Sequence, residues 1–407
     1  MRYHRPVTRR TLSIIAVASA LIAACGIDLA GTRLEETTPN DGGGVEASVI
    51  DGAPTDSSVL TDAGADVSEG PVLPSNVDAS LLAPDAGDLI GPMYIDTLAL
   101  TINGALPAVG ISFVHDKVGA VDVAVLSVGA FVVDKVLDVS GDRGLVILAS
   151  GDVSIKELLR VDGQEATITG PGGFGPGLGP LSGGAGGPGE NANNGGNDNS
   201  GGGGGGHGTR GANGGSGNDV AGGDGGSAYA IPMVGGSGGG RGDPPGCNTR
   251  GGAGGGALQV FSRTTIAIGP LGMVHAGGGG GDGALCSTGS AAGGGAGGYI
   301  LLEAPSLTVH GVVAANGGGG GGSDTGGFFG TRGQEGQFSD RFADGGTGFM
   351  ANGGSGGTSA LPTAGGSNTN SAGGGGAAGL IYFHYRGSKI DRDGGIVSPA
   401  SRDDGGL

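Results

Sequence analysis

The 407-residue chain lacks most of the patterns on which a membrane span or an enzyme active site depends. It has no run of 18 or more apolar residues, and a helix needs about 20 to cross a bilayer. It contains no Gly-Lys-Ser or Gly-Lys-Thr tripeptide, which excludes a phosphate-binding loop of the Walker type. Its six histidines are scattered and predict no metal-binding set. We therefore expect neither a spanning helix nor a nucleotide or metal centre.

Basic residues are also scarce, with 20 Lys and Arg against 38 Asp and Glu and a formal net charge of −18. The first 24 residues contain four arginines and no acid, so their removal would leave a mature chain at −22. Such a protein repels nucleic acid and anionic membrane surfaces. We predict no nucleic-acid partner.

The N-terminus reads as an export signal. Four arginines between residues 2 and 10 precede an apolar stretch, Leu12–Ala24, which is too short to span a bilayer. Ile22-Ala23-Ala24-Cys25 resembles the lipobox of bacterial lipoproteins. The resemblance implies cleavage before Cys25 and lipid on its sulfur and new amino group. An ordinary signal peptide with an incidental Cys is the alternative, and Thr8–Leu12 faintly resembles a twin-arginine signal.

Lipidation would make the chain membrane-anchored, because two or three acyl chains hold a protein stably. Gly26 follows the cysteine, where the sorting rule of the resembled lipoproteins would place Asp for retention at the inner membrane. We therefore predict a cell-envelope protein anchored to the outer membrane, at its surface or periplasmic face. Residues 26–90 hold 13 acids and one basic residue, Arg33, and no aromatics. This composition favours a disordered tether over a small acidic domain.

From about residue 95, Val, Ile and Leu become frequent, and two stretches match at an offset of 22 residues. Phe131 maps to Val153, Val133 to Ile155 and Leu137 to Leu159. Within each unit the apolar residues alternate with others, which is strand periodicity. Segments 257–276, 299–315 and 380–397 repeat the same order of a strand, a turn, an alternating strand, a Gly turn and a short strand.

Three short strands in about 20–24 residues resemble one coil of a right-handed parallel β-helix, as in pectin-lyase-like proteins. A unit that cannot bury its own apolar face must stack on neighbours. The predicted class is all-β. The expected parts are a signal peptide (1–24), lipidated Cys25 with a disordered tether (25–90), β-helix coils (91–169), a Gly-rich insertion (170–256), further coils (257–400) with Gly-rich insertions at 277–297 and 317–378, and a tail (401–407).

Glycine dominates these insertions, because 85 of the 103 glycines lie after residue 169. The tracts are either flexible coil, since glycine loses the most entropy on ordering, or a polyglycine-II-like bundle, in which no side chain keeps the backbones apart. A strict Gly-X-Y period is absent and Pro is sparse, which excludes collagen. By composition the tracts resemble glycine-rich repeat domains of some bacterial surface proteins.

Two cysteines remain besides the lipidated one. In an exported protein, Cys247 and Cys286 are candidates for a disulfide, with free thiols or intermolecular pairing as the alternatives. The bond would close a loop of about 40 residues and restrain the unfolded chain by roughly 3–4 kcal/mol.

Motifs for chemistry are weak. Asp391 and Asp393 near His384 are the best catalytic candidates, because paired carboxylates can serve as acid and base. A solvated turn is the plainer interpretation. Asp219, Asp282 and Asp324 close Gly-rich stretches that fit the start of a calcium-binding nonapeptide, so Ca²⁺ is the one cofactor considered. These copies are isolated rather than tandem, and Arg241-Gly242-Asp243 fits an adhesion tripeptide by composition alone.

The sequence therefore predicts a non-enzymatic envelope lipoprotein with a structural or adhesive role. Envelope polysaccharide and other cell surfaces are the expected partners. A carbohydrate-active β-helix enzyme, a polysaccharide lyase or hydrolase, is the alternative, because proteins of that resemblance carry clustered Asp, Arg or Lys along one groove.

Overall fold

The computed structural model describes residues 73–165, 167–179, 184–187, 199–217, 221–243, 249–286, 289–324, 329–386 and 390–404. Every structural statement below concerns these residues, which belong to one compact unit, Ser68–Leu407. The signal peptide, Cys25 and residues 26–72 of the predicted tether lie outside them. Within the described ranges, no helix is long and apolar enough to cross a membrane, and the one helical element is the single turn η1 (Ala79–Leu81).

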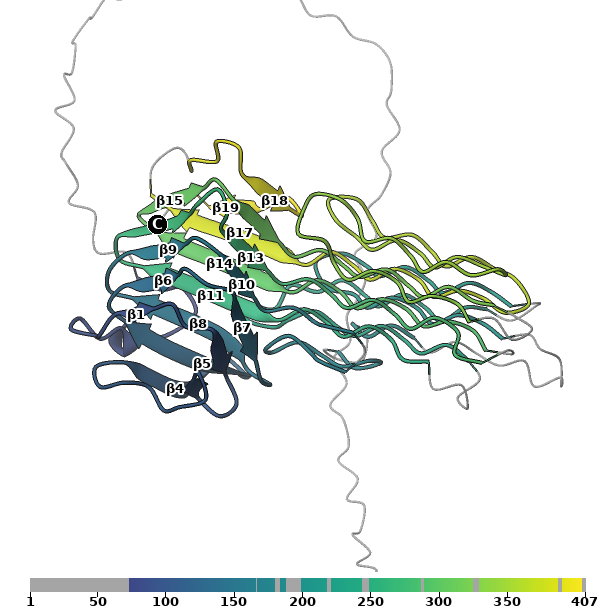
Figure 1. Ribbon diagram of the computed structural model, residues 1–407, viewed down its shortest axis with the longest axis horizontal. Helices are drawn as coiled ribbons and strands as arrows, with labels where there is room; N and C mark the ends of the chain where they lie inside the picture. Colours follow the sequence, from purple (N-terminus) through teal and green to yellow (C-terminus); the bar gives the residue numbers. More distant parts are fainter. Residues whose placement is uncertain are drawn as a thin grey trace, which may run out of the picture. The chain divides into compact units, whose positions relative to one another are not determined.

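Short strands form three sheets (Figure 1). Sheet A contains β1 (Leu89–Ile90), β6 (Phe131–Val133), β9 (Val153–Ile155), β12 (Thr265–Ile268) and β15 (Ser306–Val309). Sheet B contains β3 (Thr101–Ile102), β2 (Tyr94–Asp96), β7 (Leu137–Ser140), β10 (Leu158–Arg160), β13 (Met273–His275), β16 (Val312–Ala314) and β18 (Ile396–Ser398). Sheet C contains β4 (Ser112–Val118), β5 (Val121–Val128), β8 (Gly144–Ala149), β11 (Ala257–Ser262), β14 (Tyr299–Ala304), β17 (Leu380–Tyr385) and β19 (Arg402–Asp404).

The chain visits the sheets in a fixed order, C then A then B, in four successive rounds that begin at β5, β8, β11 and β14. Neighbouring strands are parallel except at two sheet margins, where β4 pairs antiparallel with β5 and β3 pairs antiparallel with β2. Phe131 pairs with Val153, Val133 with Ile155 and Leu137 with Leu159, so the predicted 22-residue offset is confirmed as the strand register. The all-β class and parallel pairing thus agree with the sequence.

Alternating apolar residues fill the space between the sheets. One row crosses sheet C strand by strand, each residue paired with the next and fully buried: Leu126, Ile147, Val260, Leu302 and Phe383. Burying each such side chain contributes about 1.5–3 kcal/mol. The core therefore runs continuously through strands that lie more than 250 residues apart in sequence.

The opposite, outer face of sheet C is also apolar and covered. Residues 75–83 run across it, and the main-chain N–H of Ala83 donates to Ser127 on β5. Val77 and Leu82 are buried there against Val125, Leu148 and their neighbours. The packed region thus begins inside the stretch assigned to the tether. At the other terminus, β19 pairs with β17 within the predicted tail.

The Gly-rich insertions run side by side away from the stacked strands in Figure 1, and hydrogen bonds join them. Gly201 and Gly204 donate to Gly215 and Ala212, at 2.9 and 2.8 Å. Gly202 and Gly205 donate to Ala291 and Gly294 of a parallel segment, and Gly203 and Gly206 donate to Gly187 and Gly184. Every third amide therefore returns to the same neighbour. Of the two alternatives for the tracts, an ordered bundle is the one that these bonds support.

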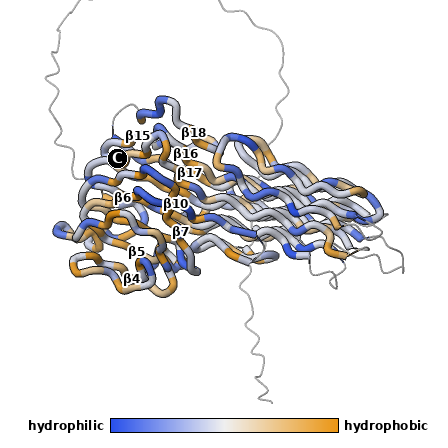
Figure 2. Tube along the Cα trace, in the orientation of Figure 1, coloured by the Kyte–Doolittle hydropathy of each residue, from blue (hydrophilic) through white to orange (hydrophobic). Residues whose placement is uncertain are grey.

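Glycine is required because the backbones are in contact. A Cβ added at Gly204 would meet the carbonyl oxygen of Gly375, and one at Gly320 that of Gly373, in both cases closer than real Cβ atoms approach. The six glycines from Gly201 to Gly206 are all buried without a side chain among them. Figure 2 shows the result, with apolar residues gathered in the strands and a largely neutral bundle beside them.

Candidate functional site

The three catalytic candidates from the sequence are not brought together. Asp391 bridges Thr308 of sheet A, and its Oδ2 lies 3.0 Å from Nε2 of His310. The main-chain N–H of Asp393, together with His310, lowers the pKa of the Asp391 carboxyl. Asp393 itself sits in a turn rather than on a strand, so the two carboxylates do not lie side by side on one face of a strand.

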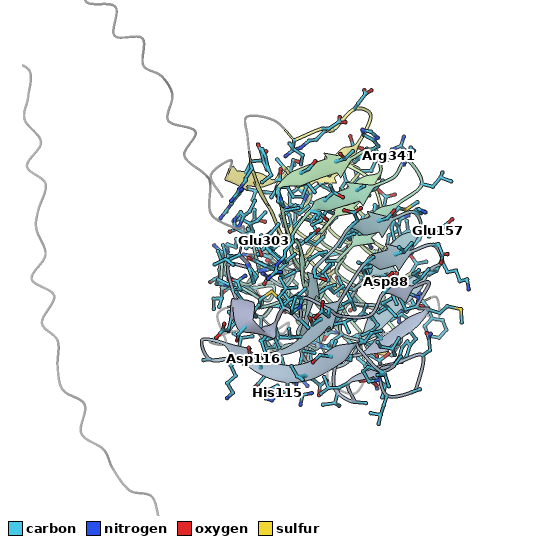
Figure 3. All side chains as sticks on the ribbon, turned by 90° about the vertical axis from the view of Figure 1, so that its left-hand side faces the viewer. Asp88, His115, Asp116, Glu157, Glu303 and Arg341 are labelled. Carbon is cyan, nitrogen blue, oxygen red and sulfur yellow. The ribbon has the colours of Figure 1, made fainter. Side chains whose placement is uncertain are left out.

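His384 has a different carboxylate partner. It lies on β17 in sheet C, where its Nδ1 is 3.0 Å from Oε1 of Glu303 on the adjacent strand β14. Glu303 is fully buried although ionisable, and Figure 3 places it on the other side of the stack from Asp88 and Glu157. The sequence signal was available, since Glu303 is the one charged residue in the strand Tyr299–Ala304.

Glu303 is the centre of a polar cluster on the outer face of sheet C. Nε2 of Gln259 donates to its Oε2 at 2.5 Å, and the main-chain N–H of Ser75 lies 3.3 Å from its Oε1. A buried carboxylate is tolerated only when such donors replace water. Glu303 thus fastens the start of the 75–83 segment to sheet C, as Ser127 fastens its end.

A cavity of about 280 Å³ lies beside this cluster. Its lining comes from the 75–83 segment, from Ala230 and Pro232 of the first insertion, and from β14 and β17, which contribute Tyr299, Tyr382 and His384. Burial raises the pKa of the Tyr299 hydroxyl, which therefore stays neutral at any physiological pH.

The calcium candidates do not form an ion cage among the described residues, where no three His, Cys, Asp or Glu side chains are placed to share a metal. The Asp282 carboxylate instead accepts from Nε of Arg332 at 3.0 Å and from the main-chain N–H of Arg250. Asp324 is buried, and Asp219 lies outside the described residues.

Cys286 is disulfide-bonded. Cys25 and Cys247 lie outside the described residues, so the Cys247–Cys286 pairing and the lipidation of Cys25 stay predictions.

The surface layer of the bundle carries side chains at a spacing that sequence reasoning missed. Arg210, Asn213 and Ser216 are exposed while the residues between them are partly or fully buried, and Ala221, Asp224 and Ser227 repeat the spacing. Exposure at every third residue matches the three-residue period of the hydrogen bonds. Non-glycine residues three apart within a Gly-rich tract were the available signal.

Three exposed apolar side chains lie within two residues of glycines at which bundle segments meet. Glycines at 283, 330 and 348 are in backbone contact through Gly322 and Ser323. Close to them in sequence, Leu285, Phe329 and Phe349 are 50%, 65% and 84% exposed. We call these three residues the apolar tip. Exposed apolar groups of this kind are typical of contact sites, and Phe349 is the most exposed phenylalanine among the described residues.

His207 is the most deeply buried titratable group of the bundle. Its Nδ1 lies 2.7 Å from the carbonyl oxygen of Gly297, and its ring packs on Tyr229 with centroids 4.7 Å apart. Its Nε2 is buried without a hydrogen-bond partner among the described residues. Burial lowers the pKa of His207 from 6.5 to about 4.

We therefore expect acid to destabilise the bundle. As the pH falls below 6.5, His207 becomes protonated in the unfolded chain, whereas in the folded chain it is protonated only near pH 4. The unfolded state binds more protons in this window, so stability falls as the pH falls and is constant above it, with a total loss of roughly 3 kcal/mol. Urea unfolding from pH 4 to 8 should show this slope in the wild type and a shallower one in His207→Gln, which cannot titrate. Parallel slopes would contradict the assignment to His207.

Comparison with protein-family models, with curated proteins and with solved structures finds no match to this chain.

Proposed function

We propose that the chain is a non-enzymatic, lipid-anchored protein of the cell envelope with a structural or adhesive role. In this proposal the stacked strands are a right-handed parallel β-helix, and the insertions are a polyglycine-II-like bundle. The repeated C–A–B order of the strands supports the first part. The three-residue hydrogen-bond period, which equals that of a polyproline II backbone, supports the second.

The observation that carries the functional proposal is the construction of the bundle. Its glycine amides are bonded to carbonyl groups of neighbouring segments, and its interior holds hardly any side chains. Such a body is stiff and chemically plain, which suits a spacer or a display surface better than a catalytic pocket. The lipobox-like Cys25 supplies the anchor, and the outer membrane, at its surface or periplasmic face, is the proposed location.

We assign the adhesive contact to the apolar tip. Leu285, Phe329 and Phe349 come from separate segments, so the backbone bundle holds them in place while leaving them in solvent. The adhesion-type tripeptide is a poorer candidate because Asp243 is only 6% exposed. Exposed aromatic side chains supply much contact area at little entropic cost on binding.

An adhesion assay on intact cells tests this proposal. Cells displaying the wild-type chain should bind partner cells or envelope polysaccharide, and Phe329→Ser with Phe349→Ser should reduce binding about tenfold, as hot-spot losses of about 1.4 kcal/mol do. Cys25→Ser should abolish cell-associated binding by releasing the chain from the membrane. Phe342→Ser is the matched control, since Phe342 is 55% exposed outside the tip.

Equal loss in the tip and control variants would remove the adhesive role from the tip. If protease acting on intact cells releases no peptide from residues 170–378, the surface location fails and a periplasmic role replaces it.

A polysaccharide lyase or hydrolase remains the second candidate, favoured by the exposed Asp391–His310 pair. It requires the purified chain to release reducing ends from a polysaccharide, and Asp391→Asn to abolish that release. We expect no release from a broad panel.

A further inference from the structure

The cavity on the outer face of sheet C has two walls of different chemistry. Tyr299 and Tyr382 form one, with ring centroids 5.5 Å apart and planes tilted by 37°. Ala230 and Pro232 belong to the other, contributed by a Gly-rich insertion that is remote in sequence. With Ser75 and Asn76, four separate chain segments therefore converge on this space.

We propose that this cavity binds one pyranose ring of an envelope polysaccharide. The inference deepens the proposed function and rests on it, since it gives a chemical identity to the partner of a non-enzymatic envelope protein. A sugar ring has apolar C–H faces that pack on tyrosine rings, and a rim of hydroxyls that needs hydrogen-bonding groups. The cavity offers both.

The polar groups at the cavity are suited to hydroxyls. Nδ2 of Asn76 is buried beside Tyr299, and the Asn76 side chain interacts with the Tyr299 hydroxyl without a well-aligned hydrogen bond. A ligand oxygen in the cavity would give this buried amide a better-aligned acceptor. His384 also lines the cavity, and its contact with Glu303 fixes the orientation of its ring.

Charge at the cavity favours a neutral ligand. The Glu303 carboxylate is fully buried, accepts hydrogen bonds at both oxygens and does not belong to the lining of the cavity. The guanidinium of Arg402 is engaged by Tyr382, because Nη1 donates to the phenol oxygen at 3.0 Å and the group lies 5.6 Å from the ring centroid. The lining of the cavity contains no Asp, Glu, Lys or Arg, so a phosphate or an amine would lack a carboxylate, ammonium or guanidinium partner there.

Size limits the ligand to a single ring. Pockets for drug-sized molecules span about 300–1,000 Å³, and this cavity is just below that range at about 280 Å³. A polysaccharide would therefore place one residue in the cavity while the rest of the polymer stays outside. One ring buries little surface, so we expect dissociation constants in the millimolar range.

Titration of the purified full-length chain in detergent with methyl pyranosides of glucose, galactose, mannose and N-acetylglucosamine tests the proposal. The chain contains six Tyr and no Trp, so tyrosine emission is not masked by tryptophan, and two of the six, Tyr299 and Tyr382, line this cavity. At least one pyranoside should change the emission saturably. Tyr382→Ala should weaken that binding about tenfold or more and Asn76→Ala about three- to tenfold. Tyr94→Ala, which removes a half-exposed tyrosine of sheet B, should leave affinity unchanged.

The proposal is overturned if no pyranoside binds, or if Tyr94→Ala weakens binding as much as Tyr382→Ala. Asn76→Ala keeps the test decisive should Tyr382→Ala fail to fold, since unchanged affinity in a folded Asn76→Ala protein also contradicts it. Failure here is separable from failure of the proposed function, because adhesion through the apolar tip is measured with Phe329 and Phe349 variants that leave the cavity intact.

Discussion

Gly204→Ala lowers the free energy of unfolding by about 4 kcal/mol in our expectation, although it adds a single methyl group. That methyl would overlap the carbonyl oxygen of Gly375, which belongs to a hydrogen-bonded segment. Overpacking typically costs about 1–3 kcal/mol, and a backbone hydrogen bond lost when the segments separate costs about 1 kcal/mol more. A flexible side chain could turn away from the added methyl, whereas the backbone cannot.

Gly175→Ala is the matched control. A Cβ there would meet only the methyl group of Thr169, at 3.9 Å, and Gly175 does not occupy the left-handed region. Its effect should be neutral or stabilising by up to about 1 kcal/mol, because alanine restricts the unfolded chain. Urea unfolding of both variants, followed by circular dichroism, checks the pair. Similar stabilities would mean that the bundle is loose enough to admit side chains.

Asp162→Ala should destabilise the protein by about 4 kcal/mol, because it removes a buried hydrogen-bond acceptor at the junction between sheet B and a Gly-rich segment. Oδ1 of Asp162 lies 2.6 Å from Nδ1 of His275 and accepts the main-chain N–H of Gly277 at 2.9 Å. The two side chains are 5% and 2% exposed. Without the Asp162 carboxylate, the Gly277 N–H and the His275 ring nitrogen stay buried and lose this partner, and each buried polar group left unpaired costs about 1–3 kcal/mol.

An ion pair in sheet B provides the control. Asp138 and Arg160 approach to 2.6 Å, but their side chains are 43% and 31% exposed. Water can replace the lost partner there, so Asp138→Ala should cost less than about 1 kcal/mol. Denaturant midpoints of the two variants give the comparison. If both lose the same stability, burial of the Asp162 pair is not what makes it important.

Strand order was predictable because it is a local property. The match of Phe131 with Val153 and of Leu137 with Leu159 is visible in 22 residues, and it became the register. The fate of the glycine tracts was not predictable, because composition permits coil and bundle alike. The tracts form a bundle because their amides have hydrogen-bond acceptors on neighbouring segments, such as Ala291 for Gly202. The stacking of the strands determines which segments are neighbours.

The candidate site was harder to predict for the same reason. His384 and Glu303 are 81 residues apart, and the insertion between them hides their adjacency on neighbouring strands. His384 was singled out from the sequence, but it was assigned to Asp391, its nearer neighbour along the chain. Residues 73–90 were assigned to the tether from their acidity, yet Val77 and Leu82 bury against sheet C. A few apolar residues in an acidic stretch are a weak signal without the surface that receives them.

The bundle's hydrogen bonds have a kinetic consequence. The amide of Gly202 donates to Ala291, and the amide of Gly374 donates to Gly202. The bundle is therefore held by hydrogen bonds between residues that lie tens to more than a hundred positions apart in sequence. Folding slows as contacts become less local, because the entropy of closing long loops is lost before the contacts can repay it. We expect the strands to assemble first and the glycine segments to join last. During folding the tracts would then stay open to proteases and chaperones after the core has formed.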